Sequence, residues 1–157
     1  MALAAGTDVG NYRVEGVLGR GGWATVYSAR HVQTGRLVAL KVLAGDPTEE
    51  FVARFRREGR LQASLEHPHV VTVFEAGESE HGLYLAMRLV SGPTLAALMR
   101  ERALDAASAL GLLRQVADAL DAAHAAGLVH RDVKPQNVLV GDSDDAYLGD
   151  FGLTTLG

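Results

Sequence analysis

Apolar and polar residues alternate along the first ninety residues, and this spacing is typical of half-buried β-strands. One stretch breaks the alternation. It predicts a helix that opens at Asp46-Pro47-Thr48 and runs to about Leu65. Pro47 suits the first turn of a helix, and the acidic Glu49 and Glu50 suit its positive end. The alternation predicts five strands around this helix, at residues 12–18, 24–29, 36–43, 70–75 and 83–89.

The second part of the chain has helical periodicity. Strand character stops at Ser91-Gly92-Pro93, the best candidate for a domain boundary. A short helix is expected over residues 94–101. A longer one is expected over residues 106–126, capped by Asp105 and closed by Gly127. Apolar residues occupy most of the circumference of the long helix, which predicts burial on several sides. Two short β segments, residues 138–140 and 147–148, follow.

Composition narrows the possible functions. The 157 residues carry a net charge of −4, which argues against a nucleic-acid partner or an anionic membrane surface. The absence of cysteine excludes a disulfide framework, a thiolate zinc site and a cysteine nucleophile. Residues 1–10, a short leader, lack the charge and apolar core of a secretory signal, and no stretch has the length of a membrane span. We therefore expect a cytoplasmic protein with no membrane segment in this chain.

A glycine-rich connection joins the first two predicted strands. Gly19-Arg20-Gly21-Gly22 would let backbone N–H groups approach anionic oxygens closely. A tight hairpin that needs a positive φ angle would explain the same residues.

A lysine lies inside the apolar third strand. Lys41 is one of only two lysines among the fifteen basic residues of the chain. It either extends from a sheet edge into solvent or is buried and needs a charged partner, which Glu58 on the following helix can supply. Glu58 would equally suit a solvated helix face beside Arg54 and Arg57.

The polar residues near the end of the chain have the most specific order. The segment His130-Arg131-Asp132-Val133-Lys134-Pro135-Gln136-Asn137 follows the long helix, and Asp150-Phe151-Gly152 comes thirteen residues after Asn137. One carboxylate, one lysine, one amide and a second carboxylate around a β turn can position a hydroxyl, neutralise a phosphoryl group and hold Mg²⁺. The alternative is a loop of surface charges with a turn glycine.

In this order the motifs resemble the start of a eukaryotic-type protein kinase domain, most similar to bacterial serine/threonine kinases. The resemblance covers about residues 11–157. It implies an α+β, bilobal fold with a leader at residues 1–10. Residues 11–90 would form an N-lobe with a five-stranded antiparallel sheet and one helix, and residues 91–157 would form an incomplete helical C-lobe.

The resemblance also implies ATP and Mg²⁺ as cofactors and a protein serine or threonine as the acceptor. Lys41, paired to Glu58, would contact the α- and β-phosphates. Asp132 would orient the substrate hydroxyl, and Lys134 would stabilise the transferring phosphoryl group and favour Ser/Thr over Tyr. Asn137 and Asp150 would hold Mg²⁺. The remaining residues expected around ATP are Leu18, Gly19, Gly21, Gly22, Val26, Ala39, Met87, Arg88, Val90 and Leu139.

Some positions depart from the family pattern. Ala24 replaces the third glycine of the loop, and Arg88 stands where the family often has an acid. Gln62 occupies a position where the family usually packs an apolar side chain against the phenylalanine, here Phe151, and this is expected to loosen the active alignment.

The sequence also stops five residues after Gly152, before any activation segment. We therefore expect the isolated chain to bind MgATP weakly, to show no robust peptide phosphorylation, and to self-associate through exposed C-lobe helices. The alternatives are a non-catalytic nucleotide-binding or interaction module derived from a kinase, and a truncated product that folds poorly.

Overall fold

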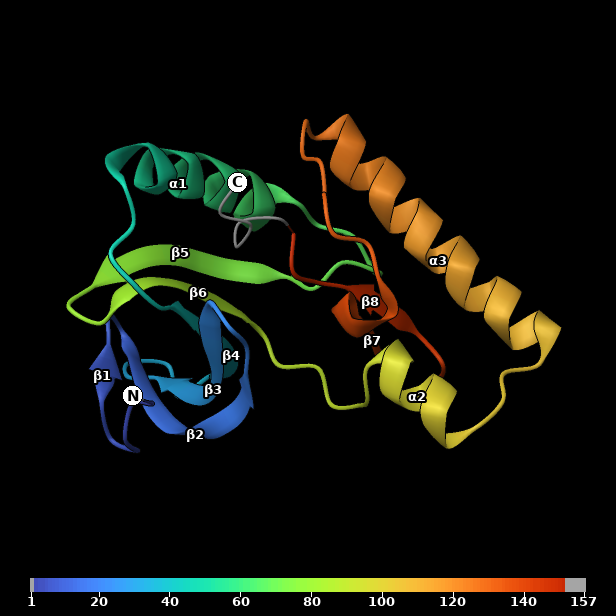
Figure 1. Ribbon diagram of the computed structural model, residues 1–157, viewed down its shortest axis with the longest axis horizontal. Helices are drawn as coiled ribbons and strands as arrows, with labels where there is room; N and C mark the ends of the chain where they lie inside the picture. The colour runs from blue at the N-terminus through green and yellow to red at the C-terminus, as the bar shows by residue number, and fades with distance from the viewer. Residues whose placement is uncertain (1, 152–157) are drawn as a thin grey trace. The chain divides into compact units, whose positions relative to one another are not determined.

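The computed structural model describes residues 2–151 (Figure 1). These residues form two compact units. The first unit contains residues 2–63 and 73–89, and the second contains residues 64–72 and 90–151. The chain passes from the first unit to the second at Leu89, and residues 64–72 belong to the second unit although they are flanked in sequence by the first.

The first unit is built on a six-stranded antiparallel sheet with the strand order β1-β2-β3-β4-β6-β5. One helix, α1 (Glu49–Ser64), connects β4 to β5. Figure 1 shows this helix lying along β5 and β6. The strands are β1 (Asp8–Val9), β2 (Tyr12–Arg20), β3 (Ala24–His31), β4 (Leu37–Leu43), β5 (Val73–Ser79) and β6 (Gly82–Arg88).

The sheet has one strand more than the five predicted, because residues of the predicted leader contribute β1. Asp8 and Val9 pair with Arg13 and Tyr12 of β2, and Val9 is completely buried. The Gly6 N–H also donates to the Val14 carbonyl over 2.8 Å. A two-residue strand is too short to produce a detectable alternation, so the sequence pattern did not reveal it.

The fourth predicted strand begins later than expected. Residues 70–72 are not part of β5, which starts at Val73. Val70 instead forms an isolated bridge with Leu148, and the Val71 N–H donates to the Leu148 carbonyl over 2.9 Å, both within the second unit. The apolar run is therefore continuous in sequence but is divided between two different pairing partners.

Alternation along the central strand β4 produces the two apolar cores of the first unit. Leu40 and its even-numbered neighbours pack with Tyr27 and Tyr84 on one face. On the other face, Leu43 packs with Phe51 and Phe55 of α1.

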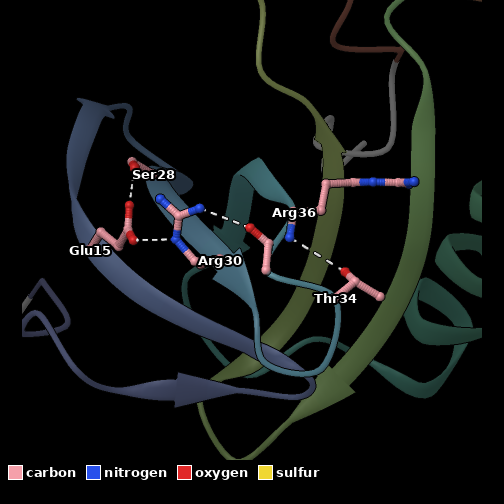
Figure 2. A network of polar contacts seen from close by, with 6 residues as sticks. Glu15, Ser28, Arg30, Thr34 and Arg36 are labelled. Atoms are coloured by element: carbon pink, nitrogen blue, oxygen red, sulfur yellow. Dashed lines mark hydrogen bonds and ion pairs between the residues drawn. The ribbon is translucent and has the colours of Figure 1, made fainter.

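Exposed polar side chains form contacts around the end of β3 and the turn that leads to β4 (Figure 2). The Arg30 Nε atom lies 2.8 Å from a Glu15 carboxylate oxygen, and Arg30 also donates to the Gly35 carbonyl over 2.8 Å. Arg36 donates its backbone N–H to the Thr34 hydroxyl over 3.4 Å. The Arg30–Glu15 pair joins β3 to β2, and such an exposed ion pair contributes little to stability.

Gln62 is a polar residue on the buried face of α1. The residue is 5% exposed, and its side-chain Nε2 has no hydrogen-bond partner among the described residues. Burying an unpaired amide costs about 1–3 kcal/mol. Replacing Gln62 with Met, which has a similar length, is therefore expected to raise the free energy of unfolding by about 1–2 kcal/mol.

Urea unfolding followed by circular dichroism measures this difference, and Gln33→Met at an exposed position is the matched control. A lower stability of Gln62→Met than of the parent chain would show that the amide makes a favourable interaction in solution.

The second unit contains two helices and a small hairpin. Thr94 caps the first helix through a 3.1 Å bond from the Ala97 N–H, and Asp105 caps the second through a 2.7 Å bond from the Ser108 N–H. The Gln115 side chain accepts from the Ala146 N–H over 2.6 Å and so joins the long helix to the hairpin. The elements are α2 (Leu95–Glu101), α3 (Ala106–Ala125), a 3₁₀ turn (Pro135–Asn137), β7 (Val138–Val140) and β8 (Ala146–Leu148).

The prediction that α3 is buried on several sides is wrong for this structure. Its buried residues form a single stripe: Leu112, Val116, Ala119 and Ala123. Leu110 and Leu113 are more than half exposed. Part of the apolar face of α3 is therefore not covered by the other residues that the structure describes.

Candidate active site

The glycine-rich connection between β2 and β3 does not need glycine for its own geometry. Gly19 lies in β2 opposite Val26, and the Gly21 N–H donates to the Ala24 carbonyl over 2.8 Å. Gly19, Gly21 and Gly22 all have φ angles outside the left-handed region, and a Cβ atom at Gly19 or Gly22 would meet no neighbour within 4 Å. The explanation that these glycines supply positive φ angles is therefore wrong, and close approach of anionic oxygens to this connection stays a prediction.

Register places four of the predicted site residues on one face of the sheet. Val26 of β3 is directly opposite Lys41 of β4, and Ala39 of β4 is directly opposite Met87 of β6. Ala39 and Lys41 are two residues apart, so all four side chains point to the same side. This is the face that continues to Leu43 and helix α1.

Lys41 is a buried residue of a central strand. The residue is 7% exposed, and β4 lies between β3 and β6. The interpretation of Lys41 as a lysine at a sheet edge is therefore wrong. A buried ammonium requires a counter-charge or hydrogen-bond acceptors. Glu58 is half-buried on α1, and its pairing with Lys41 stays a prediction.

The other residues predicted around ATP have varied exposure. Leu18 is 52% exposed, at an irregularity of the β2–β3 register. Arg88 is exposed, whereas Val90 is half-buried just after the passage from the first unit to the second. Leu139 is half-buried in β7 and forms a bridge with Thr94.

The structure brings Asp132, Lys134 and Asn137 together in the second unit. The Lys134 Nζ atom lies 2.9 Å from one Asp132 carboxylate oxygen. The Asn137 amide donates to that same oxygen over 3.1 Å and to the Asp132 carbonyl over 2.8 Å. The hydrogen bond from Lys134, supported by that from Asn137, lowers the pKa of Asp132 below its ordinary value. Asp132 is therefore an ionised carboxylate near neutral pH, fixed in position by two donors.

His130 joins this loop to the segment before Asp150, a role that was not predicted from the sequence. Its Nδ1 accepts from the Asp132 N–H over 3.1 Å, so the ring proton lies on Nε2, which donates to the Gly149 carbonyl over 2.7 Å. The His130 ring also packs on Phe151, with ring centroids 4.6 Å apart. The only feature of the sequence that could have indicated this role is the position of His130, two residues before Asp132 in a loop flanked by apolar segments.

Two residues of the site adopt backbone conformations that are unfavourable for side chains other than glycine. Arg131 has a φ angle of 67° and Asp150 one of 54°. Left-handed conformations of this kind cost about 1 kcal/mol or more and concentrate at functional sites. Gly152, the last residue of the predicted Asp-Phe-Gly motif, lies outside the described residues.

The chemistry of Asn137 and Asp150 suits a magnesium ion. Both Asn137 hydrogen bonds use its Nδ2 atom, so the Oδ1 atom is the one that would ligate a cation. The Gly149 N–H donates to the Asn137 carbonyl over 2.9 Å and thereby ties the residue preceding Asp150 to Asn137. Oxygen ligands from one amide and one carboxylate match the preference of Mg²⁺, which keeps several waters or phosphate oxygens. No cluster of three or more His, Cys, Asp or Glu with metal-ligand geometry occurs among residues 2–151.

Burial of His130 gives the second unit a predictable pH dependence. Burial lowers the pKa of His130 below its ordinary value of 6.5. The unfolded chain therefore binds this proton at a higher pH than the folded chain does. Stability from the neutral ring is complete above about pH 6.5. It falls as the pH decreases below that value, by at most about 1.4 kcal/mol per pH unit.

Urea unfolding of the parent chain and of His130→Phe between pH 7.5 and 5 isolates this effect. The stability difference between the two proteins is expected to shrink as the pH falls. A difference that is independent of pH would show that the His130 pKa is not lowered by folding.

Comparison with known proteins agrees with the geometry. Residues 12–156 match the family model described as the protein kinase domain. The chain is 46% identical over 155 residues to the serine/threonine-protein kinase PknE of Mycobacterium tuberculosis, covering 96% of this chain and 27% of PknE. It is 42% identical over 151 residues to PknD of the same organism, covering 94% of this chain and 23% of PknD.

A solved structure also matches. The crystal structure of the Mycobacterium tuberculosis PknI kinase domain superposes with a TM-score of 0.88 at 38% identity, covering 98% of this chain and 64% of that one. The chain belongs to the protein kinase family, and the predicted α+β fold class is confirmed. It spans about a quarter of the length of these PknE and PknD relatives.

Proposed function

We propose that this chain is the ATP-binding and catalytic-loop part of a serine/threonine protein kinase that transfers a phosphoryl group from MgATP to a protein hydroxyl. The observation that carries the proposal is the arrangement around Asp132, whose ionised carboxylate is held by both Lys134 and Asn137. A fixed carboxylate beside a lysine is what a kinase needs to orient an attacking hydroxyl and to stabilise the transferring group.

Each residue of the loop has a separate task in this proposal. Asp132 accepts a hydrogen bond from the substrate hydroxyl and directs its oxygen toward the phosphorus. Lys134, which is 48% exposed on its side chain, can move from Asp132 to a phosphoryl oxygen. Asn137 and Asp150 would hold Mg²⁺, which neutralises phosphate charge when bound. Catalysis then depends mainly on positioning and on electrostatic stabilisation.

The first unit would supply the nucleotide contacts. The unhindered glycines at 19 and 22 would let backbone N–H groups approach phosphate oxygens, and buried Lys41 would contact the α- and β-phosphates. Val26, Ala39 and Met87 would form part of the apolar surface for the base. The use of ATP implies a cytoplasmic setting for this domain.

Calorimetric titration with MgATP tests the nucleotide site. The parent chain is expected to bind weakly but saturably, and Lys41→Met is expected to abolish the binding because the buried cation is removed. Asp132→Asn is expected to retain binding, since that carboxylate is assigned to the acceptor hydroxyl. Arg100→Met, which removes an exposed cation of α2, is the matched control. No saturable binding by the parent chain, or binding that survives Lys41→Met, would contradict the proposal.

A phosphotransfer assay on a generic serine/threonine peptide separates binding from catalysis. We expect the isolated 157-residue chain to give no detectable transfer. Transfer that disappears in Asp132→Asn would overturn this expectation and assign catalysis to the chain itself. MgATP binding without transfer in any longer form of the protein would favour a non-catalytic nucleotide-binding module.

Within residues 2–151, none of the helices combines the length and apolar character needed to cross a bilayer.

A further inference from the structure

The first unit contains a cavity that is separate from the residues proposed to bind nucleotide. Its volume is about 260 Å³. The side chains of Trp23 and Phe51 supply aromatic walls, those of Leu43 and Leu83 supply aliphatic walls, and Asp46 and Thr48 are its polar lining. Ligand sites in proteins are usually concave and apolar with a few polar groups, and this cavity is slightly smaller than the usual range of such sites. Its size suits a ligand with one ring.

Three segments of the chain build this cavity, and hydrogen bonds fix them. The Ala44 N–H donates to the Trp23 carbonyl over 2.9 Å, which joins the β2–β3 connection to the end of β4. The Phe51 N–H donates to the Thr48 hydroxyl over 3.2 Å and so sets the first turn of α1. The backbone around the cavity is therefore already organised before any ligand binds.

Trp23 is an unusually exposed aromatic residue for a cavity wall. The residue is 62% exposed, whereas Phe51 on another wall is only 8% exposed. An exposed indole is costly in water and offers a large flat surface for packing. Nothing in the backbone of the connection demands an aromatic side chain at this position.

The charged groups at and near the cavity favour a positively charged ligand. Asp46 is the one formally charged residue among the described residues that line the cavity. Two further carboxylates, of Glu49 and Glu50, lie three and four residues after Asp46, in the exposed first turn of α1. The Arg54 guanidinium lies 5.2 Å from the centre of the Phe51 ring, so an aromatic wall already contacts a cation from the helix side. Aromatic faces and a carboxylate together attract positive charge.

We propose that this cavity is a second ligand site, and that it binds a small aromatic cation consisting of one ring and a protonated amine. The ring packs between Trp23 and the aliphatic walls, and the ammonium group lies toward Asp46. Because Trp23 follows Gly22 directly, an occupied site would hold the glycine-rich connection in place. The binding itself does not depend on the proposed kinase function.

Intrinsic fluorescence gives a direct test, since Trp23 is the only tryptophan in the chain. The probe is phenethylammonium chloride, with 2-phenylethanol as the neutral analogue and 3-phenylpropionate as the anionic analogue. We expect a saturable change in Trp23 emission with the amine, with a dissociation constant in the millimolar range that is usual for so small a ligand. The alcohol is expected to bind about threefold more weakly and the anion more weakly still.

Two variants identify the carboxylate. Asp46→Asn is expected to weaken amine binding by about two- to fivefold while leaving alcohol binding unchanged. Asp142→Asn, at an exposed carboxylate of the second unit, is the matched control and is expected to change neither. Circular dichroism confirms that each variant is folded. Saturation-transfer NMR on the same three probes detects binding that leaves the fluorescence unchanged. Absence of binding by both methods, equal binding of amine and alcohol, or no effect of Asp46→Asn would overturn the proposal.

Discussion

Replacing Gly92 with alanine is expected to destabilise the second unit by about 3 kcal/mol or more. Gly92 has a φ angle of 147°, which side chains other than glycine rarely adopt. A Cβ atom at this position would overlap the carbonyl oxygen of Val140. The backbone of β7 cannot easily move away from this Cβ atom, because two contacts hold it against residues 93 and 94. The Val140 N–H donates to the Pro93 carbonyl over 2.9 Å, and Leu139 forms a bridge with Thr94.

Gly111→Ala is the matched control for this substitution. Gly111 lies inside α3, and a Cβ atom there would meet no neighbour within 4 Å. Alanine favours a helix over glycine by about 1 kcal/mol, so this variant is expected to gain stability. Urea unfolding followed by circular dichroism measures both changes, and hydrogen exchange of the β7–β8 hairpin localises the first. Equal stability of Gly92→Ala and the parent chain would contradict the described path of residues 92–94.

Replacing His130 with phenylalanine is expected to cost about 2–3 kcal/mol at pH 7.5, although an aromatic ring is retained. The variant can still pack against Phe151, but it loses the hydrogen bonds to the Gly149 carbonyl and from the Asp132 N–H. Both backbone groups then lack the partners that the imidazole provides. The loop that carries Asp132 is expected to show the largest local increase in hydrogen exchange.

The exposed His124, in the last turn of α3, provides the control. His124→Phe is expected to change stability by less than about 0.5 kcal/mol. If His130→Phe were as stable as His124→Phe, the imidazole hydrogen bonds would contribute nothing to the fold, and the loop would be held by ring packing alone.

The sequence predicted most of the elements because their signals are local. Pro47, Asp105 and Gly127 mark helix ends through their own backbone and side-chain preferences, and alternation alone located β2, β3, β4 and β6 to within two residues. The grouping of Asp132, Lys134 and Asn137 was also predictable, because six consecutive residues of one loop contain all three.

Features that depend on distant partners were not predictable in the same way. Val70 and Val71 have the same strand character as Val73, but they pair with Leu148, and only the tertiary structure shows that division. The central position of Lys41 in the sheet likewise follows from strand order rather than from its neighbours in sequence. The support that His130 gives to the loop depends on Gly149, nineteen residues away.

Because β1 pairs with β2, the folded part of the chain includes residues that precede the family match at Tyr12. A recombinant version trimmed to start at Tyr12, the position where the family match begins, would delete the fully buried Val9. It would also delete the Leu3 N–H that donates to the Tyr27 hydroxyl over 3.0 Å. Affinity tags are therefore better separated from Ala2 by a flexible spacer than substituted for the first eleven residues. Limited proteolysis that removes the tag but leaves residues 2–11 uncut would indicate that β1 is paired with β2.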